Sequence, residues 1–239
     1  MRDALLETKA LAKSFGGVKA VDQVDFRLEM GELRCLIGPN GAGKSTFFKM
    51  LTGQHKPTSG QILFQGQDIT KAESQAIGRL GIGIKNQVPD VFDGLTALEN
   101  LTLAARFALS KPDAKRKVEE VMERLQITEV AHRLVGELAH GLRQWVEIGM
   151  VVAREPKLVL LDEPSAGMSV EETARTAELI RDINREASVI VVEHDMQFIR
   201  SIATLVTVFH QGRILVEETV DKALSDPQVR DVYLGKRAA

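Results

Sequence analysis

The sequence predicts an α/β fold in which a mostly parallel sheet carries an antiparallel β edge and a helical insertion. Three nearly continuous apolar runs, at 158–161, 189–192 and 205–209, are typical of parallel strands covered on both faces. Short stretches of alternating apolar and polar residues within 5–35 indicate half-exposed antiparallel strands instead. The two patterns together favour a parallel core with an antiparallel edge.

Spacing and capping residues predict the helices of this fold. Apolar residues in 114–126 recur at the i, i+3, i+4, i+7 spacing of one helix face, and 97–109 is a second helical candidate. Ser169 and Glu172 form a capping box that opens a helix between two predicted parallel strands, and this order implies a right-handed crossover. We expect a single domain over 1–239, with a core of 1–88 and 151–239 and a helical subdomain of 89–150.

The composition is that of an ordinary globular protein. Hydrophobic residues make up 44% of the 239 residues and charged residues 27%, whereas a disordered chain would have fewer apolar residues. The net charge of -2 gives no basic field for binding nucleic acid. No apolar run reaches the ~18 residues of a membrane-spanning helix, and the first residues do not resemble a signal peptide. We therefore expect any membrane role to act through partner subunits.

Residues 38–45 match the phosphate-binding pattern G-x-x-x-x-G-K-[ST], the P-loop. A predicted strand at 33–37 precedes the motif and a predicted helix at 45–51 follows it. The glycines let backbone amides turn toward phosphate oxygens, and the helix directs its positive end at the same anion. Lys44 is expected beside the β- and γ-phosphates, and the Ser45 hydroxyl is expected on Mg²⁺. The predicted ATP contacts are Gly38, Pro39, Asn40, Gly41, Ala42, Gly43, Lys44, Ser45 and Thr46.

Three further polar residues follow predicted parallel strands, at the sheet edge where ligands bind. Asp162 and Glu163 come directly after 158–161, and His194 follows 189–192. We predict that Asp162 holds Mg²⁺ and that Glu163 polarises the attacking water. His194 is predicted to hydrogen-bond the γ-phosphate. At this point a solvated acidic loop and a structural histidine remain the alternatives.

These residues in this order resemble the ATP-binding subunits of ABC transporters, over nearly the whole chain. The resemblance implies an ABC-type P-loop ATPase that uses ATP and Mg²⁺. Phe15 would stack on adenine, Gln87 would be the Q-loop glutamine at the catalytic water and the metal, and 165–168 would be the D-loop. It also implies membrane-spanning permease partners, a dimer with a second ATP-binding subunit, and a cytoplasmic position on the inner face of the cell membrane.

Three segments resemble the importers of branched-chain amino acids and of urea or short amides. They are Phe15-Gly16-Gly17, Glu193-His194-Asp195-Met196 and Tyr233-Leu234-Gly235. Residues 145–150 and 166–168 look more like the urea-type subunit, so urea import is favoured over amino-acid import. An ATPase of a lipid or glycan exporter, or an ATP-binding regulatory module with low turnover, remains an alternative.

The chain departs from the family at the signature segment. The family pattern Leu-Ser-Gly-Gly-Gln aligns here with Leu138-Ala139-His140-Gly141-Leu142, so a hydroxyl and an amide are missing. In the family this segment reaches across the dimer to the ATP of the partner. We therefore predict that the signature contact made by this chain is impaired, whether its partner is a second copy or a different subunit.

Overall fold

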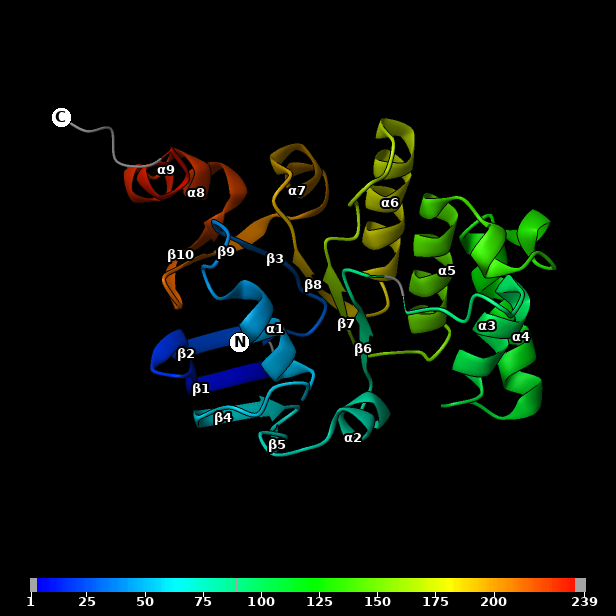
Figure 1. Ribbon diagram of the computed structural model, residues 1–239, viewed down its shortest axis with the longest axis horizontal. Coiled ribbons are helices and arrows are strands. Elements are labelled where there is room, and N and C mark those ends of the chain that lie inside the picture. The colour runs from blue at the N-terminus through cyan, green and yellow to red at the C-terminus, as the bar shows by residue number, and fades with distance from the viewer. Residues whose placement is uncertain (1–3, 89, 235–239) are drawn as a thin grey trace.

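Two β-sheets and the helices packed on them form the protein in a computed structural model (Figure 1). The structure describes residues 4–88 and 90–234. Pro89, at the expected start of the helical subdomain, and Gly235, in the terminal motif, lie outside the described residues. The elements below are those of the described residues.

The smaller sheet is antiparallel and has the strand order β2-β1-β4-β5. Along β2 every second side chain from Val24 to Leu28 is buried, since one face of the sheet packs on the core. This confirms the antiparallel strands expected within 5–35. The strands are β1 (Ala4–Phe15), β2 (Val18–Glu29), β4 (Ser59–Phe64) and β5 (Gln67–Asp68).

The larger sheet has six described strands in the order β10-β9-β3-β8-β7-β6. The strands β9, β3, β8, β7 and β6 pair in parallel, and only β10 is antiparallel to its neighbour. Helices or the other sheet cover both faces, which explains the continuous apolar runs. The strands are β3 (Leu33–Ile37), β6 (Ile82–Lys85), β7 (Leu158–Asp162), β8 (Ser188–Val192), β9 (Leu205–His210) and β10 (Arg213–Thr219).

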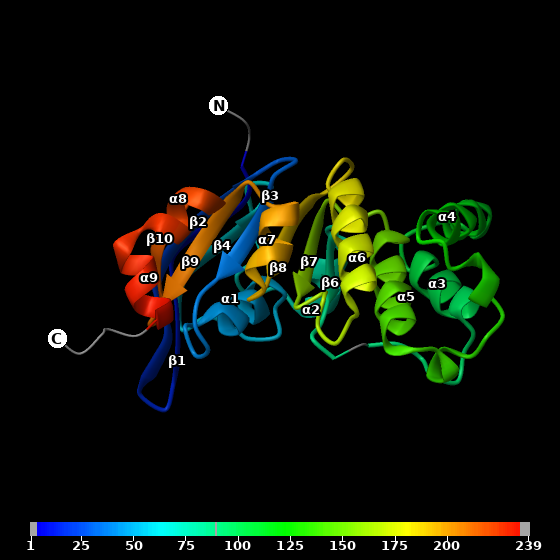
Figure 2. The same ribbon diagram turned by 90° about the horizontal axis from the view of Figure 1, so that it is seen from above.

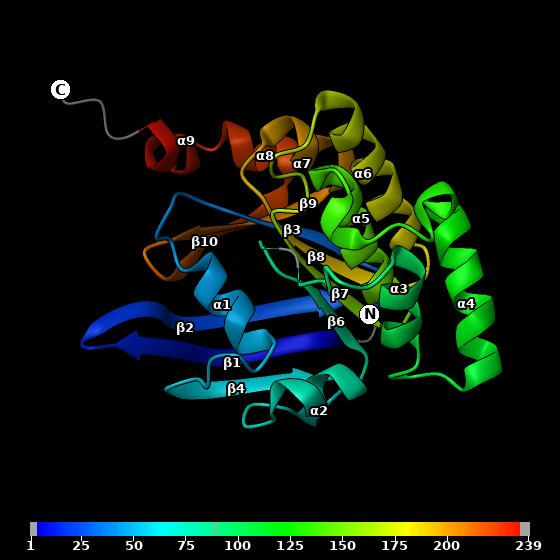
Figure 3. The ribbon, with the colours of Figure 1, turned by 45° about the vertical axis from the view of Figure 1, so that its right-hand side comes forward.

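Helix α1 (Lys44–Leu51) lies between the two sheets (Figure 3). Its buried Phe47 packs against Phe26 of the small sheet and Phe209 of the large sheet, with ring centroids 5.4 and 5.2 Å apart. Rings in such tilted contacts gain about 1 kcal/mol beyond their buried area. The packing therefore fixes the helix that follows the P-loop on both sides.

Helix α2 packs on the same side as α1, through its buried Ile77. The remaining helices cover the opposite face of the large sheet or extend away from it. Figure 2 shows α3 and α4 at one end of the molecule and α8 and α9 at the other. One apolar core joins α3, α4, α5, α6 and α7 to this face. The helices are α2 (Ser74–Arg79), α3 (Ala97–Ala105), α4 (Lys111–Arg124), α5 (His140–Val152), α6 (Val170–Ile183), α7 (Met196–Ile202), α8 (Val220–Ser225) and α9 (Pro227–Leu234), with 3-10 turns at Thr128–Val130 and Val135–Glu137.

Two predicted helix boundaries are wrong by a few residues. Helix α3 ends before Leu109 because Ser110 is extended and caps the next helix, accepting a hydrogen bond from Asp113 N. Helix α4 ends before Gln126 because that residue has φ 51°. The capping box of Ser169 and Glu172 on α6 is confirmed, and so are the fold class and its helical insertion.

Candidate functional site

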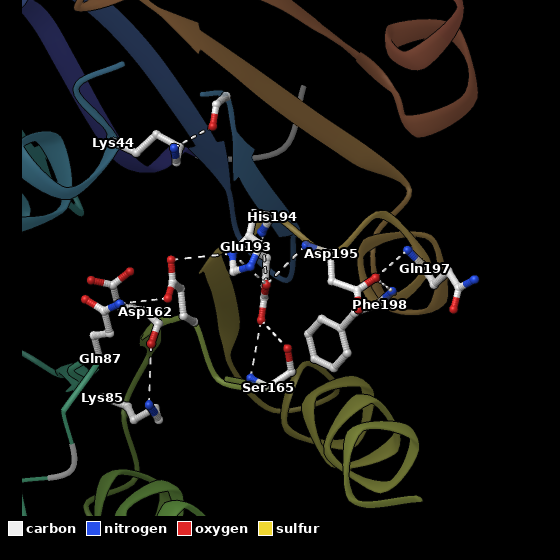
Figure 4. A network of polar contacts seen from close by, with 12 residues as sticks. Lys44, Lys85, Gln87, Asp162, Ser165, Glu193, His194, Asp195, Gln197 and Phe198 are labelled. Carbon is white, nitrogen blue, oxygen red and sulfur yellow. Dashed lines mark hydrogen bonds and ion pairs between the residues drawn. The ribbon is translucent and has the colours of Figure 1, made fainter. Parts of the chain in front are cut away.

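Four adjacent strands end at one edge of the large sheet, and each is followed by predicted site residues. The order β3-β8-β7-β6 places the P-loop first, then His194, then Asp162 and Glu163, then Gln87. Because these strands are parallel, their carboxyl ends meet along one line. Figure 4 shows the polar side chains that converge there.

The P-loop has room for a ligand on one side and tight packing on the other. A Cβ atom on Gly38 (φ 143°) would lie 2.2 Å from Phe209 O, and one on Gly43 (φ 106°) would lie 2.4 Å from Ala20 O. Gly41 (φ 77°) meets no heavy atom within 4 Å at that position. Only glycine fits at Gly38 and Gly43, and the open side at Gly41 suits the amide cradle that binds phosphate.

Lys44 and the first turn of α1 supply the positive side of the loop. The Lys44 Nζ donates to Gly38 O at 2.6 Å and Pro39 O at 3.1 Å. Burial lowers the pKa of Lys44, and the carboxylates of Glu163 and Asp162 oppose this shift. Ser45 and Thr46 lie in the first turn, whose amides have no acceptor within the helix. Charge and free N–H groups therefore point to an anion.

Glu163 brings together the polar residues of three strand ends. Its Oε2 accepts a hydrogen bond from Gln87 Nε2 at 2.8 Å, and its Oε1 lies 3.5 Å from His194 Nδ1. Its backbone N donates to Val192 O at 2.9 Å. Glu163 thus contacts both of the other residues that the sequence assigned to catalysis, Gln87 and His194.

Asp162 lies deeper than Glu163, at the end of β7. Burial and the neighbouring Glu163 raise the pKa of Asp162, and Lys85, Lys49 and Lys44 oppose the shift. The described residues hold no cluster of three acidic, histidine or cysteine side chains for a metal. Mg²⁺ typically takes one or two protein ligands and completes its shell with phosphate oxygens and water. The Ser45 hydroxyl and the Asp162 carboxylate would supply two protein ligands of this kind.

Phe15 is at the end of β1, on the small sheet. Its side chain is exposed, its ring meets His55 edge-on at 5.4 Å, and Lys13 Nζ lies 5.1 Å from its centroid. The chain of β2 returns past the P-loop, since Ala20 O is the atom that crowds Gly43. An exposed ring on this hairpin is available for stacking.

Known proteins share this fold and motif order. The family model described as ABC transporter matches residues 21–166. The chain belongs to the ABC transporter family. The high-affinity branched-chain amino acid transport ATP-binding proteins BraF of Pseudomonas aeruginosa and LivG of Escherichia coli K12 are each 33% identical to it, over 99% of this chain and all of theirs. A solved ABC transporter ATP-binding cassette in its ADP conformation matches 98% of this chain and 100% of its own, with TM-score 0.87 and 28% identity.

This ABC transporter chain is therefore an ATP-hydrolysing motor module that acts with membrane permease components. Within the described residues, no helix has the length and apolar character needed to cross a membrane.

The altered signature segment of this ABC subunit contacts the apolar core through Leu142 and the D-loop through His140. Ala139 is the N-cap of α5 and makes no side-chain capping hydrogen bond. Leu142 packs on the apolar core. His140 Nε2 lies 3.0 Å from Ala166 O in the D-loop. A Cβ atom on Gly141 would lie 2.1 Å from Glu172 Oε1, so this position admits only glycine as the side chains stand.

Sequence reasoning missed three buried charged residues at the site. Lys85 is fully buried, donates to Asn86 O at 2.8 Å, and lies 3.8 Å from Glu147 of α5. Glu193 is 1% exposed, and its carboxylate accepts hydrogen bonds from Ser165 after β7 and from His194 after β8. The available signal was a charged residue inside an apolar run, which marks Lys85 at the end of β6 and Glu147 within α5.

Proposed function

We propose that this chain drives an ABC importer whose solute is a branched-chain amino acid, urea or a short amide. The convergence of the P-loop, Glu163, Gln87 and His194 on neighbouring strand ends carries the motor part of this proposal. The names of BraF and LivG support a branched-chain amino acid. The segments 145–150 and 166–168 support urea or a short amide.

The proposed chemistry is attack of water on the γ-phosphorus of ATP. The P-loop amides and Lys44 hold the phosphates, and Phe15 stacks on adenine. Glu163 accepts the proton of the attacking water, while the Gln87 amide holds the carboxylate through its 2.8 Å hydrogen bond. His194 donates to the γ-phosphate as the bond to the ADP oxygen breaks.

Ser45, Gln87 and Asp162 are the proposed protein ligands of Mg²⁺. The ion would neutralise the charge that develops on the transferred phosphoryl group. Gln87 reaches Glu163 by its amide nitrogen, which leaves the amide oxygen for the ion.

The proposed assembly is a dimer of ATP-binding subunits on the inner face of the cell membrane. Each ATP lies between one P-loop and the opposite signature segment. In this proposal 1–88 and 151–239 form the ATP-binding core and 89–150 form the helical subdomain. This chain has an altered signature, but the ATP on its own P-loop meets the signature of the partner. With a different partner subunit whose signature is intact, the site on the P-loop of this chain would be the productive one.

The proposed permease contact lies beside Gln87. Exposed Phe92, Leu103 and Phe107 border a hollow of about 290 Å³ between α3, α5 and the chain after β6. Large exposed apolar side chains around a hollow favour a protein partner. Cysteines placed at Val91 and Asp93 should cross-link to a cytoplasmic loop of the permease in the assembled transporter. Absence of cross-links to any membrane subunit would contradict this placement.

Uptake of labelled solutes tests the importer proposal. In the organism that carries this chain, uptake of leucine, of urea and of a short amide is compared between cells with the wild-type chain and cells with Lys44→Ala. Loss of leucine uptake supports the amino-acid solute, and loss of urea uptake supports the urea solute. Unchanged uptake of leucine, urea and short amides would contradict import of this solute class.

A further inference from the structure

The carboxylate of Glu193 joins two loops of the candidate site. It follows β8 and is 1% exposed. Its Oε1 accepts hydrogen bonds from Ser165 Oγ at 2.5 Å and Ser165 N at 3.3 Å. Its Oε2 accepts from His194 N at 2.9 Å and Asp195 N at 3.4 Å (Figure 4). Each carboxylate oxygen thus accepts hydrogen bonds from one loop, Oε1 from the loop after β7 and Oε2 from the loop after β8.

A buried carboxylate in this arrangement is costly to disturb. Water does not reach it, so protein donors must satisfy its lone pairs, and four donors do so. Hydrogen bonds to a carboxylate are roughly twice as strong as neutral ones. The amide nitrogen of a glutamine would face the backbone N–H of Ser165 or those of His194 and Asp195, and only the Ser165 hydroxyl could turn to accept a hydrogen bond from it.

His194 depends on this support because its own side chain is weakly held. The imidazole is 67% exposed, and its Nδ1 lies 3.5 Å from Glu163 Oε1 and 3.8 Å from Glu193 Oε2. The backbone is held more firmly: Asp195 caps α7 by accepting from Gln197 N and Phe198 N. The position of the ring relative to Glu163 therefore depends on the backbone that Glu193 anchors.

The other loop leads away from His194 toward the signature segment. Ser165 begins the D-loop, and the carbonyl of the next residue, Ala166, lies 3.0 Å from His140 Nε2 at the start of α5. A shift of the D-loop would therefore act on one oxygen of Glu193 and reach the backbone of His194 through the other.

We propose that Glu193 is a positioning residue that sets His194 against Glu163 and makes this setting depend on the D-loop through Ser165. Glu193 contacts no reacting atom. The inference rests on the proposed function of His194 and deepens it.

Turnover, ATP affinity and stability together test this role in the full chain. Glu193→Gln should lower kcat by ~10²-fold, since a small misplacement of a catalytic group costs about that much. KM for ATP and the calorimetric Kd should change less than about 3-fold, because the P-loop is untouched. Ser165→Ala should also lower kcat. Ser165→Thr keeps the hydroxyl, so its kcat should be close to that of the wild type. The double variant should be no slower than Glu193→Gln alone, since both remove one interaction.

Glu99→Gln is the matched control. The hydroxyl and amide of Thr96 both donate to Glu99 Oε2 at 2.8 Å, which repeats the Ser165–Glu193 contact on α3. This variant should leave kcat unchanged. The ring signal of His194 in a ¹H–¹³C NMR spectrum, assigned with His194→Ala, needs no turnover. It should move in Glu193→Gln and Ser165→Ala and stay in place in Glu99→Gln.

Some outcomes would overturn the inference. They are wild-type kcat in Glu193→Gln, a parallel loss of ATP affinity and melting temperature that makes Glu193 merely structural, or an unmoved His194 signal. His194→Ala separates this failure from that of the proposed function. If His194→Ala is slow while Glu193→Gln is normal, only the positioning role fails, whereas full turnover in His194→Ala removes the role proposed for His194 itself.

Discussion

Glu163 holds a backbone conformation that glutamate rarely adopts. Its φ is 45°, in the left-handed region, which costs a residue with a Cβ roughly 1–2 kcal/mol. Hydrogen bonds from Glu163 N to Val192 O and from Ala166 N to Glu163 O hold the turn in place. The carboxylate lies between Gln87 and His194 in this conformation. Backbone strain at the residue assigned to water activation fits the clustering of such strain at functional sites.

Lys44→Ala should weaken ATP binding by about 10- to 100-fold. The variant removes a charged donor to phosphate, and such hydrogen bonds are worth about 1.5–3 kcal/mol. Isothermal calorimetry with ATP and Mg²⁺ measures the change. Lys115→Ala is the control, since that side chain is 80% exposed on α4. Equal affinity in both variants would contradict the P-loop assignment.

At the scale of elements, a buried pair ties β6 to α5. Lys85 is fully buried, and its Nζ lies 3.8 Å from Glu147 Oε2. Glu147 Oε1 also accepts from Asp90 N at 3.0 Å, just past Gln87 in the chain. Burial raises the pKa of Glu147 to about 7, against the opposing effects of the Asp90 amide and Lys85. The helix that begins in the signature segment is thus held to the chain around Gln87 by one carboxyl group.

The stability of the protein should fall between about pH 5 and pH 8 because of Glu147. The pKa of Glu147 is raised from 4.5 to about 7, so over this window the folded state keeps a proton that the unfolded state releases. The loss is up to about 3 kcal/mol and levels off above the raised pKa. Urea unfolding at both pH values measures it, and Glu147→Gln should reduce the difference. An equal pH dependence in wild type and variant would show that Glu147 does not titrate in this range.

Restoring the signature segment should raise ATP turnover. The double variant Ala139→Ser with Leu142→Gln returns the hydroxyl and the amide, and one preorganised donor to phosphoryl charge is worth roughly 10²–10³-fold in rate. We expect the turnover rate of the purified chain to rise about tenfold or more in a phosphate-release assay. Brisk turnover by the unmodified chain, with no gain in the variant, would show that backbone N–H groups suffice.

A stability measurement accompanies this test on α5. Ala139 is an N-cap without a capping hydrogen bond, so Ala139→Ser alone should stabilise the protein by about 1 kcal/mol. Leu142→Gln removes the apolar contacts of a partly buried side chain with the core and should cost about as much. Denaturant unfolding of the single variants separates these effects from turnover. A destabilised Ala139→Ser would mean that the helix start is satisfied in another way.

For the molecule as a whole, local patterns predicted the fold and the ends of the strands. The apolar runs of β7 and β8 and the motif after β3 lie within short stretches, and their order places Glu163 and His194 beside the P-loop. Helix ends were less predictable, because Gln126 stops α4 by a positive φ that its residue type does not favour. The contact between Glu193 and Ser165 spans 28 residues, and no local pattern encodes it.

For the whole molecule, an ATP-hydrolysing motor, we propose that the chemical step depends on Glu163. Single-turnover hydrolysis, with the chain in excess over labelled ATP and with Mg²⁺ present, resolves even slow chemistry. Glu163→Gln should bind ATP with an affinity close to that of the wild-type chain. It should release phosphate at least ~10²-fold more slowly, since a glutamine cannot accept the proton of the water. Phosphate release at the wild-type rate by Glu163→Gln would contradict the catalytic role of Glu163.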